Sequence, residues 1–227
     1  MITTVAFDLD DTLYDEIDYC KSGFAAAADF AAKLPNAPAA EHIFNEFWQQ
    51  FTTGDRTRVF NAAFDSLGIR CDNKLIGDMV KVYREHHPKI TLPGETSKIL
   101  EQLDGKYILA LLTDGFFPAQ KLKVLALGIE TYFKCIIYTE MLGRDCWKPS
   151  PVGFEKLLHD LNIKAENTVY VADNAQKDFI APNKLGIKTI QIIRPSRLHT
   201  EFPSQPDDAP NYVIHGISEL SDLLIKL

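Results

Sequence analysis

Hydrophobic and polar positions follow two different patterns along this chain. Between residues 15 and 91, apolar residues recur at helical spacing. The segments concerned are Ile17–Leu34, Ala39–Phe51, Arg56–Leu67 and Asn73–His87. After Gly94, short apolar runs alternate with amphipathic segments. The pattern therefore predicts a block of helices followed by alternating helices and strands.

The short apolar runs predict the strands of one sheet. They are Val5–Phe7, Tyr107–Leu112, Cys135–Tyr138, Thr168–Ala172 and Lys188–Ile193, with Tyr212–Ile214 as a candidate edge strand. Helical patterns separate them, at Thr96–Leu103, Phe117–Leu127, Val152–Leu161, Gln176–Leu185 and Ile217–Leu227. Alternating strands and helices are typical of an α/β fold with a doubly wound parallel sheet. We expect a core of residues 1–14 and 92–227, with residues 15–91 inserted as an all-helical domain.

Composition narrows the class of protein. The chain has 227 residues, 46% of them hydrophobic and 24% charged, which is ordinary for a globular protein. A net charge of −7 argues against non-specific binding to nucleic acid. No apolar stretch is long enough to span a bilayer, and the N-terminus does not have the pattern of a signal peptide. The four cysteines form no CxxC pair. We therefore expect a cytoplasmic protein with reduced thiols, whose oligomeric state the sequence does not predict.

The first apolar strand is followed directly by three carboxylates and a hydroxyl. These are Asp8, Asp10, Asp11 and Thr12. In open α/β sheets, ligands bind beyond the carboxyl ends of the strands. If strand geometry persists, Asp8 and Asp10 point to one side, where like charges repel unless a cation lies between them or one of them is protonated. The motif thus favours a hard divalent cation, Mg²⁺. An Asp-rich turn is the alternative interpretation.

Further polar residues follow the later strands and are expected to reach the same crevice. Thr113 follows the second strand, Lys148 lies in the loop after the third, and Asp173 and Asp178 follow the fourth. Thr113 can donate a hydrogen bond to a phosphoryl group, and Lys148 can neutralise negative charge. Asp173 can hold the metal. Asp178 can help directly, through water, or by orienting Lys148.

The two carboxylates of the first motif suit different chemical roles. A carboxylate at the strand end, Asp8, can attack phosphorus and give an aspartyl-phosphate. A second carboxyl group, Asp10, can protonate the leaving alcohol and later take a proton from water. The sequence therefore assigns nucleophilic catalysis to Asp8 and acid/base catalysis to Asp10.

Taken in order, these motifs make the chain resemble the haloacid dehalogenase superfamily of phosphohydrolases. The motifs are Asp8-x-Asp10-x-Thr12, Thr113 after an apolar strand, Lys148-Pro149 and Asp173-x₄-Asp178. The resemblance implies a Rossmann-like core, Mg²⁺ and an aspartyl-phosphate intermediate. It also implies a metal bound by Asp8, the Asp10 backbone carbonyl and Asp173, and a helical insertion that acts as a mobile cap.

The chain departs from the family pattern at three positions. Ala172 precedes Asp173 where the family usually has Gly, and Asp114 stands where the second motif often has Asn. Trp147, directly before Lys148, is bulkier than expected. Beside the catalytic groups, the expected substrate contacts are Thr12, Asp114, Gly115, Arg144 and Trp147.

The motifs favour a Mg²⁺-dependent phosphatase acting on a small phosphomonoester of the sugar phosphate or nucleotide class. A 2-haloacid dehalogenase also uses an Asp nucleophile, but needs no metal and lacks an acid equivalent to Asp10. A phosphomutase uses the same core and remains an alternative. The non-enzymatic alternative is a receiver-like signalling module phosphorylated on Asp. Receivers are shorter, carry no helical insertion and are phosphorylated on a later strand.

Overall fold

Two compact units make up the chain. The computed structural model describes residues 1–203 and 205–227. The core unit comprises Met1–Ile17 and Thr91–Leu227, and the helical unit comprises Asp18–Ile90. The helical unit is inserted between the first and second strands of the core sheet, as the sequence pattern predicts. The boundaries 14/15 and 91/92 stay a prediction for limited proteolysis.

The core unit is built on a parallel sheet. Its strands are β1 (Thr4–Phe7), β2 (Ile108–Thr113), β3 (Cys135–Tyr138), β4 (Thr168–Ala172), β5 (Lys188–Ile192) and β6 (Tyr212–Ile214). They lie in the order β3-β2-β1-β4-β5-β6, and every neighbouring pair is parallel. The strand order places β1 between β2 and β4, so the residues after β1 leave the sheet near its centre. The predicted doubly wound α/β fold is confirmed.

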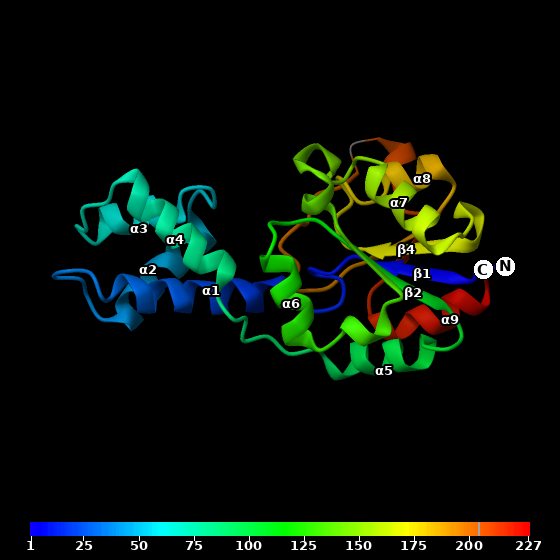
Figure 1. Ribbon diagram of the computed structural model, residues 1–227, viewed down its shortest axis with the longest axis horizontal. Coiled ribbons are helices and arrows are strands. Elements are labelled where there is room, and N and C mark those ends of the chain that lie inside the picture. The colour runs from blue at the N-terminus through cyan, green and yellow to red at the C-terminus, as the bar shows by residue number, and fades with distance from the viewer. Residues whose placement is uncertain (204) are drawn as a thin grey trace. The chain divides into compact units, whose positions relative to one another are not determined.

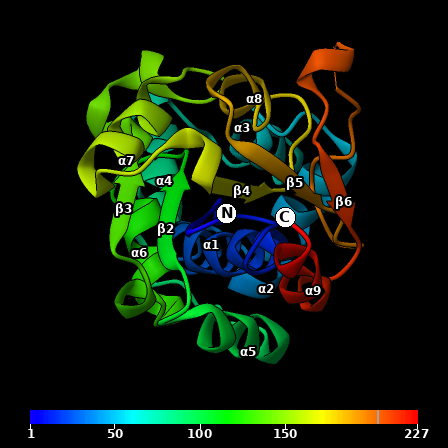
Figure 2. The same ribbon diagram turned by 90° about the vertical axis from the view of Figure 1, so that its right-hand side faces the viewer.

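Helices cover both faces of this sheet. They are α5 (Gly94–Leu103), α6 (Ala119–Leu127), α7 (Val152–Leu161), α8 (Ile180–Leu185) and α9 (Leu220–Ile225). Figures 1 and 2 show α7 and α8 on one face, and α5, α6 and α9 on the other. Because both faces are covered, the central strands are predominantly apolar rather than alternating. The face below α7 includes Ala6, and there Phe154 packs edge-on against Tyr170 with ring centroids 4.8 Å apart.

Three helices of the core begin later than the sequence pattern predicts; one is the closing helix, expected from Ile217, in which Ile217–Glu219 form a 3₁₀ turn before α9 begins at Leu220. The predicted helix Phe117–Leu127 begins at Ala119, because the residue before a proline disfavours helical backbone and Pro118 follows Phe117. The predicted helix Gln176–Leu185 begins at Ile180. There the Asn174 side chain accepts a hydrogen bond from the Gln176 N–H at 3.0 Å, a local turn that competes with helix.

The helical unit has an aromatic core. Its helices are α1 (Glu16–Ala31, the first two residues of which belong to the core unit), α2 (Ala40–Thr53), α3 (Val59–Ser66) and α4 (Asn73–Glu85). The Phe24 ring lies 6.2 Å from that of Phe47 and 4.9 Å from that of Tyr83, centroid to centroid. A Cβ on Gly23 would lie 2.6 Å from the Tyr83 ring, so this close approach requires glycine. The aromatic residues of α2 therefore serve packing within this unit.

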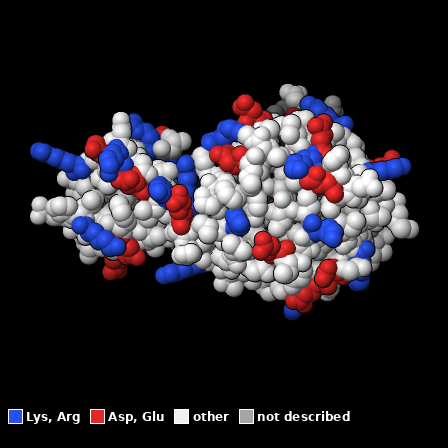
Figure 3. Space-filling view, viewed as in Figure 1, with Lys and Arg blue, Asp and Glu red and all other residues white. Residues whose placement is uncertain are grey.

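One face of the core unit can be examined for its distribution of charge. On the visible face of the core unit, basic and acidic side chains are interspersed (Figure 3). None of the helices in the described part of the chain has the length and hydropathy that a membrane crossing requires.

Candidate active site

The loop after β1 turns sharply, and a single buried carboxylate holds the turn. Asp11 has a left-handed backbone with φ of +51°, a conformation that Asp tolerates better than most residues. Its Oδ1 accepts a hydrogen bond from the Glu16 N–H at 2.8 Å, and its Oδ2 accepts one from the Leu198 N–H at 2.7 Å. Strand β1 ends at Phe7, so strand geometry does not persist to Asp10. The condition for Asp8 and Asp10 to share one side of a strand is therefore not met, and the two carboxylates have different partners.

Asp8 lies at the buried end of β1, next to Lys148. Its N–H donates to the Val171 carbonyl at 2.9 Å, which continues the pairing of β1 with β4 by one residue. Its Oδ1 lies 3.0 Å from the Lys148 Nζ. Burial raises the pKa of Asp8 to about 6, although the lysine charge opposes the shift.

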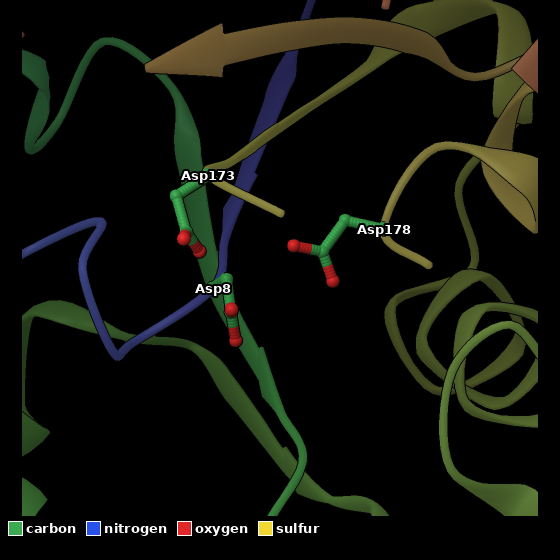
Figure 4. A group of neighbouring side chains, drawn as sticks. All are labelled: Asp8, Asp173 and Asp178. Atoms are coloured by element: carbon green, nitrogen blue, oxygen red, sulfur yellow. The ribbon is translucent and has the colours of Figure 1, made fainter. Parts of the chain in front are cut away.

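Two further carboxylates face Asp8 across a small space (Figure 4). Carboxylate oxygens of Asp8, Asp173 and Asp178 all lie within 4.8 Å of one another. The Asp178 Oδ2 accepts a hydrogen bond from the Asn174 N–H at 2.9 Å. The Asp173 Oδ2 is buried and has no hydrogen-bond partner in the described residues. Burial, together with the charge of Asp178, raises the pKa of Asp173 well above its usual range.

This donor set fits a hard divalent cation. The three side chains offer carboxylate oxygens, which magnesium and calcium prefer over nitrogen and sulfur ligands. Lys148 is the single cation paired directly with this group in the described residues, at 3.0 Å from Asp8 and 2.8 Å from Asp178. One lysine cannot neutralise three carboxylates, so a bound cation would remove the remaining repulsion.

The Lys148 ammonium group is enclosed by polar atoms. Besides the two carboxylates, it donates a hydrogen bond to the Tyr170 hydroxyl at 3.0 Å. Although burial disfavours its charge, the charges of Asp178 and Asp8 raise the pKa of Lys148 well above its usual range. Lys148 is therefore a fixed positive charge beside Asp8. Tyr170 contacts Lys148 from β4. Because Tyr170 lies within an apolar strand, the sequence gives no indication that its hydroxyl reaches this site.

The Asp10 side chain belongs to a different cluster. Lys123 of α6 places its Nζ 2.8 Å from both Asp10 carboxylate oxygens, and the Gln120 Nε2 donates to Oδ2 at 2.8 Å. The Tyr14 hydroxyl donates to Oδ1. Burial favours the neutral form, but the Lys123 charge and these hydrogen bonds lower the pKa of Asp10. The Asp10 carboxylate is not part of the three-carboxylate group, so the predicted metal role of Asp10 is left to its backbone carbonyl.

Thr113 and Asp114 of the second motif have hydrogen-bond and ion-pair partners from several elements. The Thr113 Oγ1 accepts a hydrogen bond from the Gln120 Nε2 at 2.7 Å. The Asp114 Oδ1 accepts from the Thr139 hydroxyl at 2.8 Å, and its Oδ2 lies 3.1 Å from the Lys177 Nζ. Gly115 has φ of +136°, and a Cβ there would lie 2.7 Å from the Gln120 side chain. The substrate contacts expected for Asp114 and Gly115 stay predictions.

The remaining candidates lie in different surroundings. Thr12 is fully buried, and its Oγ1 has no hydrogen-bond partner in the described residues. The Arg144 guanidinium lies over the rings of Phe116 and Trp147, at 4.2 Å and 4.3 Å from their centroids. The Trp147 Nε1 is buried without a hydrogen-bond partner in the described part of the chain. Their substrate contacts also stay predictions.

Comparison with known proteins agrees with this arrangement. The sequence profile described as haloacid dehalogenase-like hydrolase matches residues 2–186. The chain belongs to the haloacid dehalogenase-like hydrolase family. Glyceraldehyde 3-phosphate phosphatase of Methanopyrus kandleri is 28% identical over 235 residues, which cover 100% of this chain and 99% of that protein.

Solved structures of the same family share the fold. The 2-haloacid dehalogenase of Pseudomonas syringae pv. tomato is 24% identical, with a TM-score of 0.67 and coverage of 100% of this chain and 99% of that one. The HAD-hydrolase YfnB of Bacillus subtilis, solved bound to magnesium, is 23% identical, with a TM-score of 0.69 and coverage of 98% of each chain. At this identity, the two structures support the fold alone.

Some residues that contact the candidate site had no place in the sequence motifs. Gln120 and Lys123 reach Asp10 from α6, and Lys177 reaches Asp114 from the loop after β4. Gln120 and Lys123 lie one helical turn apart, on the same buried face as Val124. Polar residues on the apolar face of a helix are the signal that could have identified them.

Proposed function

We propose that this chain is a Mg²⁺-dependent phosphatase that hydrolyses small phosphomonoesters through an aspartyl-phosphate on Asp8. The observation that carries the proposal is the pairing of the buried Asp8 with Lys148, beside two further carboxylates and a separate acid, Asp10. A fixed cation beside the nucleophile stabilises charge on the transferring phosphoryl group. Asp10 supplies the second carboxyl group that hydrolysis of a poor leaving group requires.

In the proposed reaction, the bound phosphate dianion raises the pKa of Asp10 by repulsion between like charges, so that the Asp10 carboxyl group carries a proton in the complex. Asp8 attacks phosphorus, the bond between phosphorus and the leaving oxygen breaks, and Asp10 gives its proton to that oxygen. Asp10 then removes a proton from the water that cleaves the acyl phosphate. Thr113 and Lys148 contact the phosphoryl oxygens. Asp8, Asp173, Asp178 and the Asp10 backbone carbonyl would hold Mg²⁺, which supplies positive charge to the phosphoryl group when bound.

Three-carbon phosphates are the first substrates to test, because a similar protein is a glyceraldehyde 3-phosphate phosphatase. The panel extends to other sugar phosphates, phosphorylated hydroxy acids and nucleotides, with phosphate release as the readout. We expect activity on some of these esters with Mg²⁺, and its loss in a chelator. Absence of phosphate release from the whole panel would contradict the proposal.

The dehalogenase alternative is tested in the same preparation by halide release from 2-chloropropionate. We expect none, because the second carboxylate Asp10 is present and paired with Lys123. Halide release that persists in a chelator would favour the dehalogenase hypothesis over the phosphatase. The phosphomutase alternative is tested by supplying a second sugar: transfer of phosphate to it, in place of release to water, would favour a mutase.

A further inference from the structure

Helix α6 connects the candidate acid/base group to the candidate phosphate-binding hydroxyl. Gln120 donates through one nitrogen to Asp10 Oδ2 at 2.8 Å, to the Thr113 Oγ1 at 2.7 Å and to the Asp114 carbonyl at 2.7 Å. An amide nitrogen has two hydrogens, so these three acceptors share them. Gly115 leaves the space that the Gln120 side chain occupies.

Lys123, also on α6, adds an ion pair with the Asp10 carboxylate to the hydrogen bond from Gln120. Its side chain is 4% exposed and its Nζ lies 2.8 Å from both oxygens of Asp10. A lysine on the buried face of a helix is costly unless it is paired, so Asp10 and Lys123 depend on each other. Glu16, whose Oε1 lies 3.9 Å from the same Nζ, is the second acidic neighbour.

Both oxygens of the Asp10 carboxylate have partners, but the side chain is not fully buried. Tyr14 and Lys123 contact Oδ1, and Gln120 and Lys123 contact Oδ2, so both torsions of the side chain are fixed. The Asp10 side chain is still 17% exposed, which leaves it accessible to a bound ester. An acid that must deliver a proton to one oxygen of the substrate works best when its orientation is set in advance.

We propose that Lys123, together with Gln120, is a positioning residue for Asp10 that orients its carboxyl group toward the leaving oxygen. The inference rests on the proposed phosphatase function and on the acid/base role of Asp10 within it. The Lys123 Nζ makes its shortest ion pair with the Asp10 carboxylate, at 2.8 Å, and lies 3.9 Å from Glu16. Its effect on the reaction therefore passes through Asp10.

The test compares esters whose leaving groups differ in their need for a proton. Lys123→Met and Lys123→Gln are measured on 4-nitrophenyl phosphate and on the best alkyl phosphate of the panel, with Mg²⁺ present. We expect each variant to lower kcat/KM about 100-fold on the alkyl ester and less than about 5-fold on the aryl ester. Lys121→Met is the matched control, because Lys121 lies exposed on the same helix. It should leave both values unchanged.

A double-mutant cycle separates positioning from a general structural effect. Once Asp10 is replaced by Asn, Lys123→Met should cause no further loss on the alkyl ester, because the group that it positions is gone. A variant that merely lowers the folded fraction would reduce both esters equally and would lose activity again in the Asp10→Asn background. Either of these results, or full activity of Lys123→Met, would overturn the proposal.

The same measurements separate this inference from the proposed function. Asp10→Asn could lower kcat/KM more on the alkyl ester than on the aryl ester while Lys123→Met does not. That result would support the phosphatase proposal and contradict the positioning role of Lys123. If wild-type protein hydrolyses no ester, or if Asp10→Asn is not selective, the assigned role of Asp10 fails and the positioning role fails with it.

Discussion

Asp8 and Asp10 are two residues apart, yet their carboxyl groups have opposite surroundings. Burial raises the pKa of Asp8 to about 6, and Lys148, its cation, is shared with Asp178. Asp10 is only partly exposed as well, but Lys123 contacts both of its oxygens and the pKa of Asp10 is lowered. The difference lies in the lysine that neutralises each carboxylate: Lys148 is shared between Asp8 and Asp178, whereas Lys123 contacts both oxygens of Asp10.

This contrast indicates which of the two carboxylates is prepared for a cation from outside the chain. Asp8, Asp173 and Asp178 form a group that one lysine does not neutralise, and an oxygen of Asp173 has no partner in the described residues. In contrast, both oxygens of the Asp10 carboxylate are contacted by side chains, from Lys123 and Gln120 of α6 and from Tyr14. One short motif thus divides into an Asp8 pole, whose carboxylates suit a metal ion, and an Asp10 pole, which is paired within the chain and for which we propose the acid/base role.

The largest expected effect is the loss of activity when Asp8 is replaced. Asp8→Asn should lower kcat by at least about 10⁴-fold on every ester, because an amide cannot form the acyl phosphate. Phosphate release under saturating substrate measures the loss, and a thermal melt close to that of wild type shows that the fold is retained. Substantial turnover by the Asp8→Asn variant would remove Asp8 from the nucleophile role.

A smaller and selective effect is expected from the Asp10 pole. Asp10→Asn should lower kcat on alkyl phosphates by roughly 10²–10³-fold, within the usual range for loss of a general acid. Aryl phosphates, whose leaving groups need less protonation, should lose roughly 10-fold or less. A linear free-energy plot of log kcat against leaving-group pKa measures the difference. Parallel plots for the variant and wild type would contradict the acid/base assignment.

The two poles also show what the sequence could and could not predict. The apolar strands and the polar residues that follow them were sufficient for the sheet, the insertion and the approach of Asp173 to Asp8. The divergence of Asp10 could not be predicted, because it depends on where β1 ends and on the left-handed backbone at Asp11. Lys123 could not be assigned either, since only the fold brings α6 to a loop 113 residues earlier.

The second motif offers a further test of how charge is balanced around Asp8. Asp114 stands near the proposed phosphate site, and Lys177 lies 3.1 Å from its Oδ2. Lys177→Met should leave this carboxylate unpaired and weaken inhibition by inorganic phosphate about 10-fold, through repulsion of the anion. Adding Asp114→Asn should restore the inhibition constant, because the amide is neutral and its oxygen can still accept from Thr139.

Lys184→Met is the control for this pair, because Lys184 is exposed on α8 and should leave the inhibition constant unchanged. If Asp114→Asn fails to rescue Lys177→Met, Lys177 acts on the anion directly and not through Asp114. Measurement at low and constant ionic strength keeps the electrostatic contribution to phosphate binding comparable among the variants.

The smallest expected effect concerns Glu16, which lies beside the Asp10 pole. Burial and the charge of Asp10 raise the pKa of Glu16 from 4.5 to about 8. An acid whose pKa is higher in the folded state binds more protons when folded, so its contribution to the free energy of unfolding falls as pH rises between these two values. Glu16→Gln removes this contribution. The Tm of the variant relative to wild type should therefore rise between about pH 5 and about pH 8.5, by roughly 3 °C or more for a chain of this size. Glu155→Gln, at an exposed position of α7, should show no such trend. A flat difference for Glu16→Gln across this range would mean that Lys123 keeps Glu16 ionised together with Asp10, so that the lysine serves both carboxylates equally.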